Sequence, residues 1–157
     1  MTSLSPARIG WTIVIAALTI AAGACGSTDT TTPTSATQTT TTDILTGTVP
    51  APVGGALQSA FNTFTVGQGG GTVSVTLTSA VETLPGGALL TTVTMGLGVG
   101  TPSGGACTGI GSNFVTAQGS STAQLTGSLS AGSYCVQVSD VTSQLGPVTY
   151  AVAVAHP

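Results

Sequence analysis

The chain contains 157 residues, enough for one domain with additional segments, and only five of them are charged: Arg8, Asp29, Asp43, Glu82 and Asp140. Hydrophobic residues make up 41% of the sequence, so a buried core is possible and disorder throughout the chain is disfavoured. A single basic side chain cannot neutralise a phosphate backbone, which excludes nucleic-acid binding.

The beginning of the sequence has the pattern of an export signal. Arg8 and the amino terminus supply positive charge, and an uncharged apolar run follows over residues 9–22. A run of about 14 residues is short for a membrane-spanning helix, which needs roughly 20. Small residues then stand directly before Cys25. The pattern predicts a signal peptide over residues 1–24, with cleavage behind Ala24.

This arrangement of small residues before Cys25 resembles a bacterial lipoprotein signal. The resemblance implies that Cys25 is lipidated on its sulfur, becomes the first mature residue and anchors the protein to a membrane of the cell envelope. Ala22 and Ala24 also form an ordinary signal-peptidase site, at which the same bond is cut and Cys25 stays unmodified. A retained membrane helix is the third interpretation, disfavoured by the short run and its uncharged flank.

A Thr-rich segment over residues 27–43 precedes the domain. It shows no hydrophobic period, so it cannot bury an apolar face, and we expect a disordered linker. The mean reach of such a linker is about 20–25 Å. The sequence therefore divides into a signal peptide (1–24), an anchor Cys with its linker (25–43) and a domain (44–157). Whether the linker is glycosylated stays open.

The domain shows the period of β-strands and no helical period. Apolar and polar residues alternate in about eight short runs, and Gly- and Pro-rich turns separate the runs. Strands with one apolar face each predict an all-β fold, an antiparallel sandwich of about eight strands with Thr and Ser on its outer faces. The runs are residues 45–49, 61–66, 73–78, 93–99, 114–118, 123–129, 134–139 and 148–154.

The apolar positions of these runs define a predicted core. A domain of this size buries about two-thirds of its unfolded surface, which is enough for a stable interior. The predicted core residues are Phe64, Val66, Val73, Val75, Leu77, Val93, Met95, Leu97, Val99, Leu125, Leu129, Tyr134, Val136, Val138, Tyr150, Val152 and Val154.

One stretch, residues 131–138, reads Ala-Gly-Ser-Tyr-Cys-Val-Gln-Val, with a Gly at a turn and alternate apolar residues on one side. Together with the runs before and after it, over residues 58–155, this stretch resembles the bacterial pre-peptidase C-terminal domain. The resemblance implies a jelly-roll-like sandwich on an exported protein, and the motif implies a fold, not an activity. Members of that family that bind calcium use several acidic residues. Residues 44–157 hold only Glu82 and Asp140, so we expect no metal and no cofactor.

Cys107 and Cys135 are the two cysteines of the domain. Two thiols in an exported protein usually pair, so we predict a disulfide, worth roughly 3–4 kcal/mol in the chain-entropy model. Strand alternation places Cys135 on the face opposite to Val136, so the bridge is expected to fasten residues 101–111 across the outer face of the strand. The spacing is not Cys-x-x-Cys and no cation is near in sequence, which disfavours a redox role.

The other candidates for chemistry are two carboxylates and one imidazole. Nothing in the sequence places Glu82 and Asp140 together, so we expect surface or turn acids and not a catalytic pair. His156 stands beside Pro157, where a side chain is expected to be frayed and exposed. The Ser and Thr hydroxyls lack a convincing base. The sequence therefore predicts a protein that is not an enzyme.

These features together predict a non-catalytic lipoprotein of the bacterial cell envelope that acts as an accessory or interaction module. An envelope protein or a neutral glycan is the expected partner, because a nearly uncharged chain exerts little electrostatic steering. The alternative is a solute- or carbohydrate-binding lipoprotein, which needs a concave pocket with convergent polar groups. A filled sandwich without a cleft favours the first of these functions, and a lined cavity favours the second.

Overall fold

A computed structural model describes residues 38–111, 113–141 and 144–157, and in these ranges the chain forms ten β-strands and no helix. The expected signal peptide, Cys25 and most of the Thr-rich segment lie outside the described residues. The strands are β1 (Thr41–Val49), β2 (Ser59–Val66), β3 (Gly71–Thr83), β4 (Leu89–Leu90), β5 (Met95–Ser103), β6 (Ala106–Thr108), β7 (Phe114–Ala117), β8 (Leu125–Leu129), β9 (Gly132–Asp140) and β10 (Val148–His156).

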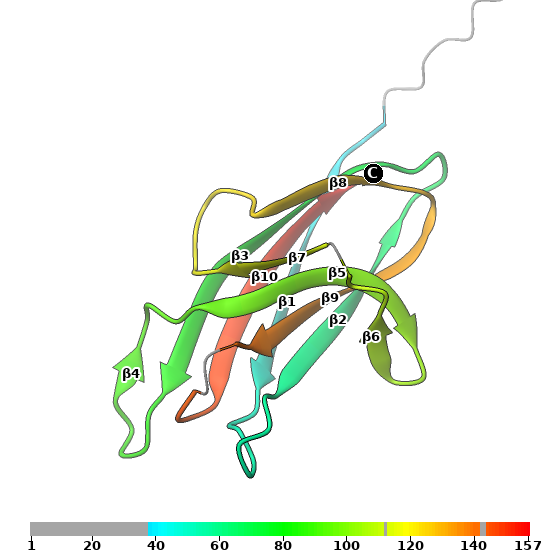
Figure 1. Cartoon of the computed structure of the whole chain (residues 1–157). Coiled ribbons are helices and arrows are strands. Elements are labelled where there is room, and N and C mark those ends of the chain that lie inside the picture. Colours follow the sequence, from blue (N-terminus) through cyan, green and yellow to red (C-terminus); the bar gives the residue numbers. More distant parts are fainter. Residues whose placement is uncertain (1–37, 112, 142–143) are drawn as a thin grey trace, which may run out of the picture. The chain divides into compact units, whose positions relative to one another are not determined.

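The strands form two antiparallel sheets (Figure 1). The first sheet has the order β1-β10-β3, and both β8 and β4 pair with the far edge of β3. The second has the order β2-β9-β5, and both β7 and β6 pair with β5. The longer strands thus run 1-10-3-8 in one sheet and 2-9-5-7 in the other, which is a jelly-roll sandwich.

The predicted all-β sandwich is therefore confirmed, and the eight predicted runs correspond to eight of the strands. The two additional strands, β4 and β6, are two and three residues long. They were not predicted because alternation cannot be recognised over so few residues. Each extends a hairpin at the end of a long strand, β4 on β3 and β6 on β5.

The core lies between the sheets and matches the predicted set closely. All the predicted core residues are buried except Leu125, Leu129 and Tyr134, which are partly buried and pack against the core. Alternation succeeds here because each strand has one face toward the other sheet. The buried hydrophobic residues that the prediction omitted are Val49, Ala80, Ala117 and Val148, together with the two disulfide cysteines.

Strand β5 is buried on its outer face as well, at three glycines. Gly96, Gly98 and Gly100 alternate with its core residues, and all three are buried. A Cβ on Gly98 would lie 2.3 Å from Ile110 Cγ2, and a Cβ on Gly100 would lie 2.2 Å from the carbonyl oxygen of Thr108. The absence of side chains on β5 therefore lets the following segment, which contains β6, lie directly on the outer face of the second sheet.

A disulfide between Cys107 in β6 and Cys135 in β9 fixes this segment, with a Cα–Cα distance of 5.8 Å. Cys135 is fully buried beneath the β6 hairpin. The predicted bridge and its position on the outer face are both confirmed.

The domain begins earlier than the sequence suggested. Strand β1 starts at Thr41, so the expected boundary at residue 44 is three residues late, and Asp43 belongs to the sheet, opposite Val154. Gln38 also contacts the domain, because its side-chain nitrogen donates a hydrogen bond of 2.5 Å to the carbonyl oxygen of Gly70. Thr favours strands, and β10 offers it a backbone edge, so the last Thr residues of the expected linker pair instead.

Candidate functional site

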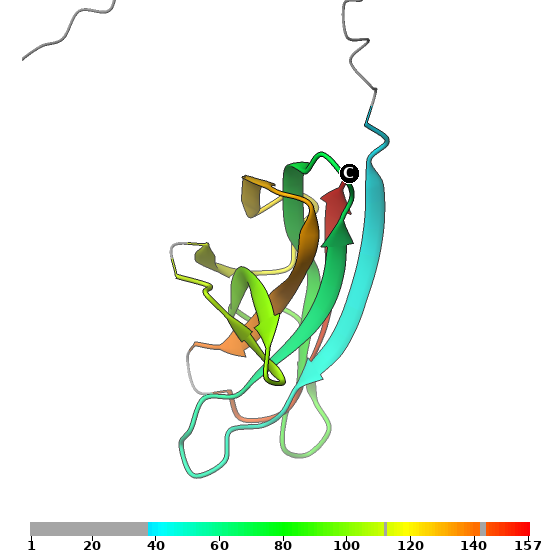
Figure 2. The same ribbon diagram turned by 90° about the vertical axis from the view of Figure 1, so that its right-hand side faces the viewer.

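Three connections meet at one end of the sandwich (Figures 1 and 2). They are the β1–β2 loop (50–58), the β3–β5 connection with β4 (84–94) and the β9–β10 loop (141–147). The strand register requires this arrangement, because Val148 at the start of β10 pairs with both Val49 and Glu82 at the ends of β1 and β3. The start of β1 lies at the opposite end, beside the last residues of β10.

Two buried carboxylates hold the β9–β10 loop. Oε1 of Glu82 accepts hydrogen bonds from the backbone nitrogens of Leu145, at 2.5 Å, and Gly146, at 2.8 Å. Oδ2 of Asp140 accepts a bond of 3.1 Å from the backbone nitrogen of Gln144. Glu82 and Asp140 are only 4% and 2% exposed, so the expectation of surface acids was wrong for both. Each instead binds backbone nitrogens of the β9–β10 turn, which is the other role that the sequence left open.

The same end is tied together by further bonds. The backbone nitrogen of Asp140 donates to the carbonyl oxygen of Gln58 at 2.9 Å, which joins the β9–β10 loop to the β1–β2 loop. The backbone nitrogen of Thr83 donates to the carbonyl oxygen of Pro147 at 3.0 Å. Gln144 is buried against Met95. The bases of these loops are thus fixed by hydrogen bonds and burial, and both carboxylates serve this structural purpose.

The outer parts of the three connections carry exposed aliphatic side chains. Val53 is 73% exposed, Leu89 is 66% exposed and Leu145 is 71% exposed. Leu57 and Leu90 are also exposed. We call these five residues the aliphatic loop surface. The sequence of all three connections contains neither a charged nor an aromatic residue.

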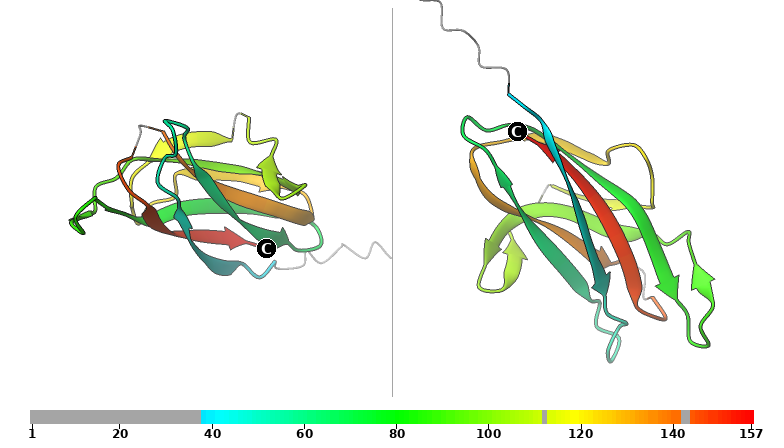
Figure 3. Two further views of the ribbon diagram at one scale, coloured as in Figure 1. Left: turned by 90° about the horizontal axis from the view of Figure 1, so that it is seen from below. Right: turned by 180° about the vertical axis from the view of Figure 1, so that it is seen from behind.

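A second candidate surface is the outward face of the sheet that contains β1, β10 and β3, which lie side by side (Figure 3). Its side chains are uncharged and, apart from the exposed Ile44, mostly small, and several hydroxyls bond within the sheet, such as Thr78 Oγ1 to the carbonyl oxygen of Ala151 at 3.0 Å. We call its exposed and half-exposed hydroxyl residues the hydroxyl face: Thr42, Thr46, Thr48, Thr72, Ser74, Thr76, Thr78, Ser79, Thr83, Thr126, Ser128 and Thr149.

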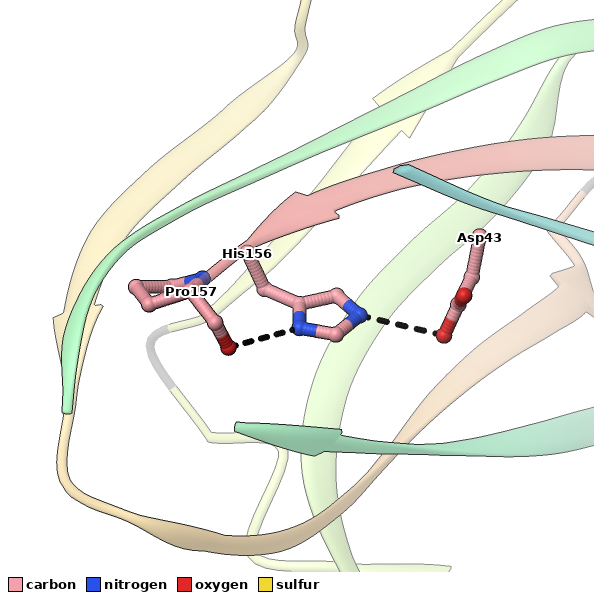
Figure 4. Close-up of polar contacts among 3 residues, drawn as sticks. All are labelled: Asp43, His156 and Pro157. Carbon is pink, nitrogen blue, oxygen red and sulfur yellow. Dashed lines mark hydrogen bonds and ion pairs between the residues drawn. The ribbon is translucent and has the colours of Figure 1, made fainter. Parts of the chain in front are cut away.

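His156 lies at the opposite end from the three connections and is buried (Figure 4). Its Nε2 lies 3.0 Å from Oδ2 of Asp43, its Nδ1 lies 3.1 Å from the carbonyl oxygen of Pro157, and its ring packs on Phe64. The expectation of a frayed, exposed side chain was therefore wrong. Both ring nitrogens are therefore occupied by contacts within the domain.

A small pocket opens between β3, β5 and β8. Its volume is about 100 Å³, and most of its side chains are apolar, including Val73, Val99 and Leu125, with Asn113 at one side. Ligand sites for drug-sized molecules usually have volumes of about 300–1,000 Å³. The volume of this pocket is therefore well below that range.

Within the described ranges, no group of three or more His, Cys, Asp or Glu side chains is placed to hold a metal ion. The same part of the chain has no helix with the length and apolarity that crossing a bilayer requires. The predicted lipidation site, Cys25, lies outside the described residues.

Comparison with protein-family models, with curated proteins and with solved structures finds no match to this chain. The two surfaces and the buried polar groups therefore have to be interpreted from their own chemistry.

Proposed function

We propose that this protein is a non-catalytic lipoprotein of the bacterial cell envelope that acts as an accessory or interaction module. Lipidation of Cys25 would hold the protein on a membrane, and the Thr-rich segment would set the distance between that membrane and the domain. Support comes from the apolar run that ends in small residues before Cys25. The jelly-roll sandwich agrees with the proposed relationship to the pre-peptidase C-terminal domain.

The observation that carries the proposed interaction role is the hydroxyl face. It is a broad sheet surface, built from four neighbouring strands, with no charged side chain among its described residues. Hydroxyls offer donors and acceptors without fixed charge, so the face suits a neutral partner. We infer that this partner is another envelope protein or a neutral glycan, and that binding depends little on salt.

The alternative, a solute- or carbohydrate-binding lipoprotein, would need a larger cavity than the pocket of about 100 Å³ beside β8. The carboxylates and the imidazole are already engaged in contacts within the domain, which also weighs against an enzyme. The interaction module therefore remains the function that the geometry supports best.

Mass spectrometry of the full protein purified from a bacterial host tests the anchor. We expect a chain that begins at Cys25 and carries a diacylglyceryl group on its sulfur, with a further acyl group on its amine in some bacteria. A chain that begins at Cys25 without lipid would contradict the anchor and leave export intact.

Photo-crosslinking in intact envelopes tests the interaction role. A photoreactive residue in place of Thr126 on the hydroxyl face should capture a partner. The matched control replaces Thr65, an exposed Thr of β2 in the other sheet, and should capture much less. Strong, salt-sensitive retention of the protein on an acidic polymer, or tight binding of a small solute, would contradict the proposal.

A further inference from the structure

The aliphatic loop surface has no evident role in the stability of the domain. Isolated exposed aliphatic residues are common, but these five come from three separate connections and are gathered at one end of the sandwich. The buried Glu82 fixes the backbone position of one of these residues, Leu145. Glu82 binds the backbone nitrogen of Leu145, and the side chain of Leu145 remains 71% exposed.

The charge of this end limits the kind of partner. Its only carboxylates, Glu82 and Asp140, are buried and bonded to backbone nitrogens, and its loops contain no basic residue. Electrostatic attraction to an anionic or cationic surface is therefore negligible. Burial of apolar area is the main driving force left for a contact at this surface.

The shape of the loops distinguishes between two apolar partners. Gly54 and Gly86 lie at the tips of two of the connections, and a Cβ on either would have no atom within 4 Å, so the tips project into open space. Protein interfaces match a partner's shape and concentrate their affinity in Trp, Tyr and Arg, none of which occurs in these loops. Separate, projecting Val and Leu side chains instead suit a fluid hydrocarbon layer.

We propose that the aliphatic loop surface inserts shallowly into a neutral, zwitterionic lipid bilayer. This contact goes beyond the proposed function, because it needs neither a lipid on Cys25 nor a partner on the hydroxyl face. The two membrane contacts are also compatible. Residues 25–37 span at most about 45 Å, whereas a strand of nine residues such as β1 is about 30 Å long, so an anchor at Cys25 and the loops can reach the same bilayer.

Tryptophan fluorescence in the full chain tests this insertion. The chain has a single Trp, so Trp11→Phe provides a silent background, into which Leu89→Trp is introduced. The control is Ile44→Trp, because Ile44 is 64% exposed, close to the 66% of Leu89, but lies in β1 near the opposite end. The vesicles contain phosphatidylcholine with brominated acyl chains, which quench tryptophan within the hydrocarbon.

We expect the vesicles to quench the Leu89→Trp fluorophore about twofold or more and to shift its emission to the blue, equally at low and high salt. The Ile44→Trp fluorophore should change little. Adding Leu145→Ser to the Leu89→Trp chain should reduce the quenching. If the chain bound vesicles only through residues 1–25, position 44 would approach the bilayer before position 89 and would be quenched more. Stronger quenching at position 89 therefore cannot result from such attachment.

Absent quenching at position 89, or equal quenching at both positions, would overturn the insertion, as would quenching that requires anionic lipid. The two proposals can fail separately. A chain with Cys25→Ala that still shows quenching at position 89 keeps the loop contact even if mass spectrometry finds no lipid. A lipidated chain whose Leu89→Trp fluorophore stays unquenched keeps the anchor and loses the loop contact.

Discussion

The hydroxyl of Tyr150 donates a hydrogen bond of 2.7 Å to the side-chain oxygen of Asn62, and this bond joins the two sheets. Tyr150 lies in β10 of one sheet and Asn62 in β2 of the other. The amide nitrogen of Asn62 in turn donates to the carbonyl oxygen of Thr46 in β1, at 3.3 Å. Gly47 leaves room for the phenol, because a Cβ there would lie 2.5 Å from the Tyr150 oxygen. These contacts close the corner of the sandwich at which both sheets end.

Tyr150→Phe removes the bond between the sheets and leaves the Asn62 oxygen without that donor. We expect the free energy of unfolding in urea to fall by about 1 kcal/mol, the usual net value of a hydrogen bond with a partly buried partner. Tyr134→Phe is the matched control, because its hydroxyl bonds to the carbonyl oxygen of Ser130 at the exposed surface. Equal losses for both variants would show that the bond between the sheets stabilises the fold no more than the exposed bond of Tyr134 does.

The stability of the fold should also depend on pH through the same phenol. Burial raises the pKa of Tyr150 above its usual value of 10.0, because desolvation disfavours the charged form. The unfolded chain therefore releases this proton at lower pH than the folded chain. The contribution is fully present below pH 10 and is lost as the pH rises through the folded pKa, so the free energy of unfolding should decline there.

Urea unfolding at a series of pH values from about 9 to 11 checks this dependence. Tyr150→Phe should flatten the alkaline decline, and Tyr134→Phe, which removes the other Tyr of the chain, should preserve the part that belongs to Tyr150. An unchanged decline in the Tyr150→Phe chain would assign the effect to other groups.

Strands, core and disulfide could be predicted because each leaves a local or compositional signal. Alternation with a period of two reports which side of a strand is buried, and it identified Leu77 and Val152 as readily as Val138. The disulfide follows from two cysteines in a domain that the sequence predicts to be exported. The alternating glycines of β5 can also be read from the sequence. Their role in packing depends on the segment that covers them, and a local pattern does not predict which segment that is.

The polar contacts could not be predicted in the same way. Glu82 is buried because its oxygen meets backbone nitrogens 63 and 64 positions further along the chain. His156 is buried because Asp43, 113 positions away, pairs with it across two neighbouring strands. Burial of a charged group depends on such distant partners, and no periodicity in the sequence reports them. For the same reason, the sequence does not reveal that the residues of the aliphatic loop surface come together at one end of the sandwich.

The outer face of β5 offers a test of the packing of the β6 hairpin. Gly100→Ala would place a methyl group 2.2 Å from the carbonyl oxygen of Thr108, and the neighbouring disulfide at Cys107 limits how far that backbone can retreat. We expect the free energy of unfolding to fall by about 1–3 kcal/mol, as for other overpacked sites.

Gly127→Ala in β8 is the control for this substitution. A Cβ on Gly127 would meet no atom within 4 Å, and the residue does not need a positive φ. Since Ala also restricts the unfolded chain, this variant should match the original protein or exceed its stability by up to about 1 kcal/mol. Denaturation curves measure both, and a destabilisation of similar size in the two variants would contradict the close contact at Gly100.

Removing the carboxylate of Glu82 should release the β9–β10 loop. Glu82→Ala leaves the backbone nitrogens of Leu145 and Gly146 without the acceptor to which both now donate. A buried donor that loses a charged acceptor is costly, so we expect a loss of roughly 2–4 kcal/mol in the free energy of unfolding. Hydrogen exchange should accelerate at these two amides more than at Ala153 in the middle of β10, which pairs on both sides.

Glu82→Gln keeps a side-chain oxygen that can accept hydrogen bonds and removes the carboxylate. The amide oxygen can still accept from both nitrogens, so the loop should remain in place with a loss of about 1 kcal/mol, which reflects only the weaker bonds of a neutral acceptor. Exchange at Leu145 and Gly146 should then lie between that of the original chain and that of Glu82→Ala. If both variants destabilise equally and exchange at these amides does not change, the buried carboxylate acts through the packing of its side chain and not by holding the loop.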